Sequence, residues 1–243
     1  MRATMAHVKG IPAGYLREEL LRKANRPLAI IIGAAAASGF VGGLVFASGN
    51  ILWAIGLALP FAALLWVRLS GLRTFTEDTE DTIKGARGEV YTAAHLDLLP
   101  DSYQVFHDVK ADQGNLDHVV VGPTGVFAVE TKNWAAVVTR DNGGELLHNN
   151  RPTDKRNVGY LKSRIRWLKA AIKREDLFVY GLVVFPRADL QTDADERKDT
   201  VDCLLLKDLC QHIQGKPNQL SRQEVTQIAA FLDSLVTSDR EDD

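Results

Sequence analysis

The pattern of apolar and charged positions divides the chain into two regions. The stretch 28–67 contains no charged side chain, although charged residues recur through the rest of the sequence. Within it, apolar segments of twenty and seventeen residues run from Leu28 to Ala47 and from Ile51 to Val67. Roughly twenty apolar residues in a helix cross the hydrocarbon core of a bilayer. The pattern therefore predicts a two-helix transmembrane hairpin over this stretch, and a buried helical pair in a soluble core is the alternative.

Basic residues flank the apolar stretch on both sides, whereas the turn within it carries none. They are Arg17, Arg22, Lys23 and Arg26 before it and Arg68, Arg73, Lys84 and Arg87 after it. Because Lys and Arg accumulate on the cytoplasmic side of a membrane, both termini are predicted to be cytoplasmic, at a plasma or inner membrane. We expect residues 1–27 to be a cytosolic basic segment and residues 68–83 to be a linker.

Apolar runs after residue 84 predict a mixed α/β domain. Strands are expected over 103–109, 116–122, 126–132, 136–140, 145–149, 177–186 and 201–206, with helices over 85–99, 155–174, 207–214 and 221–236. In the first helix, Val90, Ala94 and Leu98 recur at spacings of four and predict its buried face. The domain core is expected over 84–190, followed by a C-terminal strand and helices over 191–236 and a disordered acidic tail over 237–243.

The stretch Leu116 to Trp134, LDHVVVGPTGVFAVETKNW, alternates like a β-hairpin yet carries two acids and a lysine. If Pro123 and Thr124 form a two-residue turn, Asp117 lies opposite Glu130, and Lys132 shares the face of Glu130. A three-residue loop would instead slide Asp117 opposite Thr131 and turn it to the other face. The sequence leaves both registers open.

The two-residue register has a chemical consequence, because two adjacent carboxylates repel unless a cation lies between them. Mg²⁺, or Mn²⁺ in its place, prefers oxygen ligands and keeps positions open for water and phosphate. A lysine beside such an ion supplies a further positive charge. Asp117, Glu130 and Lys132 are therefore candidate residues for phosphodiester hydrolysis, with ordinary polar residues at a strand edge as the alternative.

The segment GARGE at 85–89, together with DHVVVGPTGVFAVETKNW, resembles the nuclease-related (NERD) domain from about Gly85 to Pro186. The resemblance implies a restriction-endonuclease-like fold, a mixed sheet flanked by helices, and Mg²⁺-dependent cleavage of DNA or RNA. By position it implies that Glu89, Asp117, Glu130 and Lys132 are catalytic. Asp117 and Glu130 would hold the metal and Glu89 would bind it through water or a second ion. Ala135 and Ala136 depart from the pattern, since relatives often carry a glycine there.

The chain is nearly neutral, with a formal net charge of −2, so binding to a polyanion must rest on local patches. The predicted helix 155–174 carries eight basic residues and no acid. Candidate nucleic-acid contacts are Lys155, Arg156, Lys162, Arg166, Lys169 and Lys173. A solvated helix face and a surface for anionic lipid are the alternatives.

Together these features predict a membrane-anchored, metal-dependent nuclease with a cytosolic domain. Its partners would be nucleic acid and, through residues 28–67, the lipid bilayer. A nucleic-acid-binding module without catalysis and a membrane-tethered scaffold for protein interactions remain the two alternatives. The scattered histidines, among them His107 and His118, are expected to be structural.

Overall fold

The computed structural model describes residues 6–13, 80–112, 114–174, 176–191 and 201–237, with isolated positions between 32 and 49. The chain forms two units, one made of residues 1–14 and 84–243 and the other of residues 15–83. The predicted transmembrane hairpin belongs to the second unit and, apart from those isolated positions, lies outside the described residues. Among the described residues, no helix combines the length and the apolar character needed to cross a bilayer.

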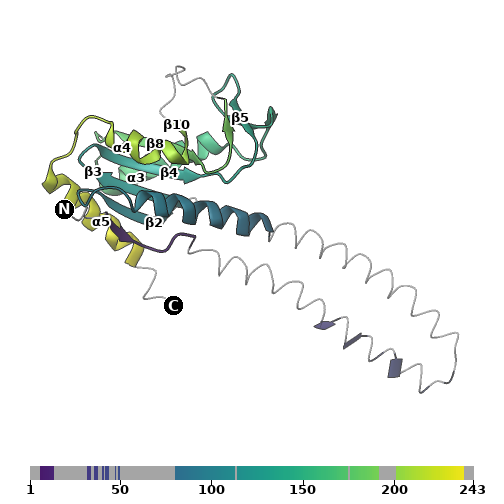
Figure 1. The fold of residues 1–243 in the computed structure, drawn as a ribbon. Coiled ribbons are helices and arrows are strands. Elements are labelled where there is room, and N and C mark those ends of the chain that lie inside the picture. The colour runs from purple at the N-terminus through teal and green to yellow at the C-terminus, as the bar shows by residue number, and fades with distance from the viewer. Residues whose placement is uncertain are drawn as a thin grey trace. The chain divides into compact units, whose positions relative to one another are not determined.

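The first unit is built on a six-stranded mixed sheet in the order β1-β2-β3-β4-β8-β10 (Figure 1). Its strands are β1 (His7–Lys9), β2 (Gln104–Ala111), β3 (Gly114–Gly122), β4 (Gly125–Thr131), β8 (Val179–Phe185) and β10 (Val201–Leu205). The β2-β3-β4 meander is antiparallel, and the outer strands join it in parallel. The prediction of a mixed α/β fold is thus confirmed.

Strand β1 was not expected from the sequence pattern. It pairs in parallel with β2 at the edge of the sheet, and Lys9 forms an ion pair with Asp233. Asp233 lies on helix α5 (Arg222–Thr237), so the N-terminal residues contact two elements of the C-terminal domain. Residues 1–14, which precede the predicted hairpin in the sequence, are therefore part of the same folded unit as residues 84–243.

A smaller sheet has the strand order β7-β6-β5-β9. Its strands are β5 (Val137–Arg140), β6 (Leu146–His148), β7 (Arg151–Pro152) and β9 (Asp189–Leu190). The predicted strands 136–140 and 145–149 correspond to β5 and β6, which pair antiparallel. The two-residue strands β7 and β9 are too short to leave an alternating pattern in the sequence.

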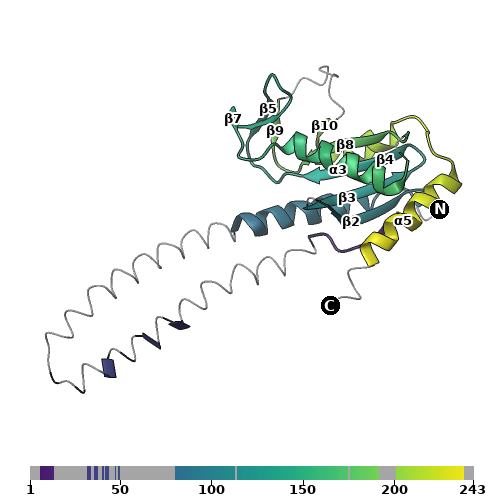
Figure 2. The same cartoon turned by 180° about the vertical axis from the view of Figure 1, so that it is seen from behind.

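Helices cover both faces of the main sheet, as the two opposite views show (Figures 1 and 2). One apolar core joins the sheet to α3 (Asn157–Ile172) and α5, with Leu161, Leu168 and Leu232 fully buried. The second core joins the other face to the helix over 80–96 and to α4 (Leu209–Gln214), which follows the 3-10 turn η1 (Leu206–Asp208). Side chains from helices on either face of the main sheet can therefore contact the ends of its strands.

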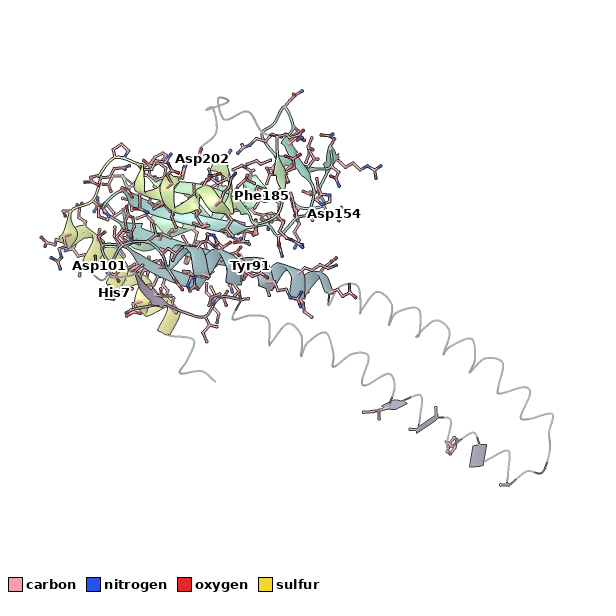
Figure 3. The ribbon with its side chains drawn as sticks, viewed as in Figure 1. His7, Tyr91, Asp101, Asp154, Phe185 and Asp202 are labelled. Carbon is pink, nitrogen blue, oxygen red and sulfur yellow. The ribbon has the colours of Figure 1, made fainter. Side chains whose placement is uncertain are left out.

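The buried face of the helix over 80–96 differs from the predicted one. Val90 and Ala94 are exposed on this helix, and so is the neighbouring Tyr91 (Figure 3), while Leu98 lies beyond the end of the helix and is 65% exposed. The buried positions instead are Ala86, Gly88, Glu89, Thr92, Ala93 and Leu96. The prediction was wrong because this face is made mainly of small and polar residues, which a search for apolar periodicity passes over.

The β3–β4 turn decides the register that the sequence left open. Gly122 pairs with Gly125 across Pro123 and Thr124, so the two-residue turn is confirmed. Gly125 has a φ of +129°, in the region that favours glycine. The Thr124 hydroxyl is within hydrogen-bonding distance of the Tyr103 hydroxyl, at 3.0 Å, which ties the turn to the segment before β2.

Candidate active site

The carboxylate of Asp117 lies where strands β3 and β4 stop pairing. The ladder between them ends at His118 and Val129, so Asp117 and Glu130 are the next two residues in register. Instead of a further backbone bond, Asp117 Oδ2 accepts a hydrogen bond from the backbone N–H of Thr131 at 2.7 Å. The side chain thus satisfies a backbone donor that the separating strands leave unpaired, and this fixes the carboxylate beside the end of β4.

The Glu130 carboxylate is held between two cations. Lys132 Nζ donates to Oε1 at 2.8 Å, and Arg164 Nη1 donates to Oε2 at 2.7 Å. The side chains of Glu130, Lys132 and Arg164 are 10%, 23% and 17% exposed, so both ion pairs are largely shielded from water. Charge-assisted hydrogen bonds of this length are strong, and together they fix the orientation of Glu130.

Glu89 reaches this region from the opposite layer because Gly88 brings its helix close to the end of β4. A Cβ at Gly88 would lie 2.6 Å from Asn133 Cβ and 3.3 Å from Thr131 Cγ2. On the same helix, Thr92 Oγ1 accepts a hydrogen bond from Thr131 Oγ1 at 3.0 Å. These contacts place buried Glu89 beside the strand end that carries Glu130.

Asn133 joins the segments that surround this strand end. Its Nδ2 donates to the backbone oxygen of Lys84 at 2.6 Å, and its Oδ1 accepts from Arg187 Nε at 3.0 Å. Farther along, the backbone N–H of Lys132 donates to Val184 O at 2.9 Å, which extends the pairing of β4 with β8. Residues 132–134 therefore connect the first turns of the helix over 80–96 with β4 and the end of β8.

The electrostatics indicate that the three acids interact. The pKa of the Asp117 carboxyl is raised well above its ordinary value, chiefly by burial and then by the negative charges of Glu130 and Glu89. The Lys132 ammonium and the Thr131 N–H act in the opposite direction but do not cancel this rise. Since like charges disfavour ionisation, a cation bound here would relieve the repulsion.

The lysine of the site stays cationic. Burial on its own would lower the pKa of Lys132, but the neighbouring carboxylates of Glu130 and Asp117 outweigh burial and raise it. A raised pKa keeps the ammonium protonated across the neutral range. Lys132 is therefore suited to stabilising negative charge or orienting a water molecule.

The acids fit a magnesium site with two carboxylates better than a cage of three protein ligands. Over the ranges that the structure describes, no group of three or more His, Cys, Asp or Glu side chains is placed to hold a metal ion. Mg²⁺ is usually bound through one or two carboxylates and keeps several waters. Asp117 and Glu130 are the two carboxylates here that would hold such an ion if one binds.

Helix α3 carries Lys162, Arg166 and Lys169 beside its buried apolar stripe, and the other predicted basic residues flank its two ends. Lys155, Arg156, Arg166 and Lys173 are exposed, whereas Lys162 and Lys169 are half-buried. The first N–H groups of the helix are already occupied, because Glu145 accepts hydrogen bonds from Val158 N at 3.1 Å and Gly159 N at 2.9 Å. A phosphate group would therefore meet the side chains of this helix rather than its N-terminus.

Arg164 is the site residue that the sequence analysis missed. It was one of the eight basic residues of the predicted helix but was counted neither with the acids nor with the nucleic-acid contacts. Its bond to Glu130 joins residues 34 apart in the chain, and no local pattern signals a contact of that range. A basic residue between the buried Leu161 and Leu168 was the only hint that it turns inward.

A family profile for the nuclease-related (NERD) domain matches residues 84–186, which include Glu89, Asp117, Glu130, Lys132 and Arg164. Residues 84–186 therefore hold a nuclease-related domain. The chain is also 44% identical over 82 residues to an uncharacterized protein of Bacillus anthracis, in an alignment that covers 31% of this chain and 39% of that protein. The chain thus spans well under half the length of this relative. No solved structure matches the chain significantly.

Proposed function

We propose that this protein is a membrane-anchored nuclease that hydrolyses phosphodiester bonds of DNA or RNA with Mg²⁺ or Mn²⁺ as cofactor. The observation that carries the proposal is the convergence of Asp117, Glu130 and Lys132 at the end of the β3–β4 hairpin, with Glu89 nearby. This group of residues lies within the nuclease-related domain. The domain match supports a nuclease-like activity in general. The metal cofactor is proposed from the acidic residues, and the membrane anchor is proposed from the apolar stretch 28–67.

Each residue of the site has a role that follows from its contacts. Asp117 and Glu130 would hold the ion, and Thr131 keeps Asp117 in place through its backbone N–H. Lys132, bound to Glu130, brings its ammonium to the same place, where it would stabilise the charge that develops on the phosphate oxygens. When bound, the metal would polarise the phosphodiester and lower the pKa of a bound water.

Basic side chains of α3 would hold the nucleic-acid backbone. Arg166 of this helix and Lys173 directly after it are exposed, and Arg164 of the same helix contacts Glu130. Phosphate contacts of this kind are independent of base sequence and weaken with salt. The continuity between the basic helix and the acidic site supports a substrate that lies across both.

The proposed anchor is the apolar stretch 28–67, with both termini and the nuclease-related domain on the cytoplasmic side. The pairing of β1 with β2 supports this arrangement, because residues before and after the stretch fold into one unit. Both ends of the stretch must then lie on the same side of a membrane, as a hairpin requires. Reaction of a cysteine introduced at residue 49 or at residue 200 with an impermeant maleimide in intact cells tests this, in a chain whose own Cys203 and Cys210 are replaced by alanine. Labelling of residue 49 alone is expected, and labelling of residue 200 would contradict the orientation.

Incubation of the full-length chain with plasmid DNA and with RNA, in the presence of Mg²⁺ or Mn²⁺, tests the activity. We expect cleavage by the wild type, none by Lys132→Ala, and none by the wild type in a chelator. Lys132→Ala should have a lower melting temperature than the wild type, because Glu130 loses a shielded ion-pair partner, and the assay temperature is kept below the melting temperature of both proteins. Cleavage by Lys132→Ala at the wild-type rate would show that the site is wrongly assigned.

One observation favours a second function, a nucleic-acid-binding module without catalysis. Both carboxylate oxygens of Glu130 are already bonded to protein cations, so that the residue has a purely structural explanation. Calorimetric titration with Mn²⁺ separates the two functions. A catalytic site should bind the ion and lose it in Glu130→Ala, whereas the module would bind nucleic acid equally well with and without a divalent cation.

A further inference from the structure

The contact between Arg164 and Glu130 sets a limit on how the proposed metal can bind. Glu130 Oε2 accepts from Arg164 Nη1 at 2.7 Å, and the other oxygen is bonded to Lys132. A divalent cation needs a lone pair of a carboxylate oxygen at a distance of about 2.1 Å. The guanidinium is therefore bonded to Glu130 Oε2, an oxygen with which a bound ion would also have to interact.

The surroundings hold Arg164 in this position. Its helix is fixed to the sheet by Leu161 and Leu168, which are fully buried on either side of it along α3. Space for the guanidinium is provided by Gly114 at the start of β3, because a Cβ there would lie 3.2 Å from Arg164 Nη2. The absence of a side chain at Gly114 thus leaves room for the Arg164 guanidinium at the edge of the acidic site.

The flexible side chain of Arg164 would also allow its guanidinium to leave Glu130. The Arg164 side chain is 17% exposed, so it reaches solvent from the bound position. A guanidinium has a long flexible stem and hydrogen-bonds carboxylates and phosphates equally well. Its release from Glu130 would leave one carboxylate oxygen available without moving the backbone of α3 or β4.

We propose that Arg164 is the internal counter-ion of Glu130 in the metal-free protein and that a divalent cation must displace it to bind. This proposal rests on the proposed function, since it assumes that Glu130 is a metal ligand. Arg164 is then a positioning residue that acts through Glu130. It keeps the acidic site neutralised while no ion is bound and lowers the apparent affinity of that site for the ion.

Direct competition has a reciprocal consequence that can be measured. If the ion and the guanidinium exclude each other on Glu130, removal of the guanidinium must tighten binding of the ion. A purely structural arginine would have the opposite effect, because its loss would leave Glu130 poorly oriented and weaken binding. The sign of the change in metal affinity therefore separates the two roles.

The experiment is a calorimetric titration of the full-length chain with Mn²⁺, without nucleic acid. Arg164→Met removes the guanidinium and keeps an apolar stem, and Arg222→Met removes the same charge from an exposed position on α5. We expect Arg164→Met to bind Mn²⁺ at least about fivefold more tightly than the wild type, within the usual range of coupling between two ligands. Arg222→Met should bind it as the wild type does.

Arg164→Lys provides the conservative variant and guards against misfolding of the methionine variant. Lysine keeps the charge but not the planar fork, so its Mn²⁺ affinity should lie between those of the wild type and Arg164→Met. Unchanged or weaker Mn²⁺ binding in Arg164→Met, at a melting temperature equal to that of the wild type, would overturn the proposal. If Arg164→Met does not fold, Mn²⁺ binding by Arg164→Lys no tighter than by the wild type overturns it.

The outcome can be told apart from that of the nuclease assignment. If the wild type cleaves nucleic acid but Arg164→Met gains no Mn²⁺ affinity, the nuclease assignment is supported and the counter-ion role of Arg164 is contradicted. Tighter Mn²⁺ binding in Arg164→Met without cleavage by any variant would do the reverse.

Discussion

Asp117 accepts a hydrogen bond from the backbone N–H of Thr131 at 2.7 Å, at the point where strands β3 and β4 separate. One side chain thus has two tasks, because the same carboxylate also faces the charges of Glu130 and Glu89. The first task stabilises the hairpin, whereas the second opposes ionisation and is unfavourable to the fold. Such an arrangement is expected where a site is kept for function.

Replacement of Asp117 can separate these two tasks. Asp117→Asn keeps an oxygen that accepts from Thr131 and removes the charge, so we expect a melting temperature equal to or above that of the wild type. Cleavage should fall by more than about 100-fold, the scale of losing one electrostatic contact at a reacting centre. Asp117→Ala should lose activity as well and also destabilise the fold by about 1–3 kcal/mol, because the buried N–H loses its partner. Thermal melts and a cleavage assay on the same samples measure both effects, and full activity in Asp117→Asn would remove Asp117 from the site.

The close approach of Gly88 to the end of β4 gives a second prediction. Alanine at this position would place its Cβ 2.6 Å from Asn133 Cβ, so the helix must shift and carry Glu89 with it. We expect Gly88→Ala to lower the free energy of unfolding by about 1–3 kcal/mol, as overpacking does, and to reduce cleavage.

Gly85 supplies the matched control for this change, because a Cβ there meets nothing within 4 Å. Gly85→Ala should stabilise the helix by up to about 1 kcal/mol, since alanine favours helix over glycine, and should leave cleavage unchanged. Urea unfolding of both variants measures the difference. Equal effects of the two substitutions would mean that the contact with Asn133 does not position Glu89.

The hairpin at the centre of the site was the most predictable part of the fold. Its strands contain the apolar runs Val119–Val121 and Val126–Val129, and the Gly-Pro-Thr-Gly turn separates them, so local rules describe it well. The register still had to come from the structure, because two- and three-residue turns were both compatible with the sequence. Helix α3 was equally clear, since its buried Val158, Leu161 and Leu168 follow helical spacing.

The parts that the sequence did not predict depend on tertiary contacts. The three-residue strand β1 has no pattern of its own and exists because the edge of β2 offers it hydrogen bonds. The bond between Arg164 and Glu130 exists because α3 packs across the sheet at one particular position. Neither the edge of a sheet nor the position of a helix on it can be read from local periodicity.

The basic residues of α3 give a prediction about nucleic-acid binding. Arg166→Gln removes an exposed charge from the helix that carries Arg164, and Lys173→Gln removes one from the residue that follows this helix. If each contacts one phosphate, each should weaken binding of a labelled oligonucleotide and reduce the slope of log K against log salt by about 1. Fluorescence anisotropy at several salt concentrations measures the slope.

The control for this prediction is Arg222→Gln, which removes an exposed charge from α5 instead. It should leave the salt slope unchanged. A slope that all three variants share with the wild type would mean that α3 does not contact nucleic acid. Binding of the same variants to vesicles of anionic lipid then tests the lipid alternative.

Behind the site, His107 and His118 face each other across β2 and β3, as expected of histidines with a structural role. Both are buried, and their Nδ1 atoms are 2.7 Å apart, so one ring donates a hydrogen bond and the other accepts it. Burial lowers the pKa of His107 to about 4, and burial together with His107 lowers the pKa of His118 well below its ordinary value. The folded state therefore favours the neutral form of both rings.

This pair makes the stability of the domain depend on pH in a defined window. The ordinary pKa of histidine is 6.5, so the unfolded chain takes up a proton as the pH falls through that value while folded His107 does not until about pH 4. The free energy of unfolding should be highest above pH 6.5 and decline between pH 6.5 and 4, by about 3 kcal/mol for His107 alone. His107→Gln should flatten this decline, whereas His7→Gln, at an exposed position of β1, should not. Chemical unfolding at a series of pH values measures the decline, and identical curves for His107→Gln and the wild type would exclude the pair as its cause.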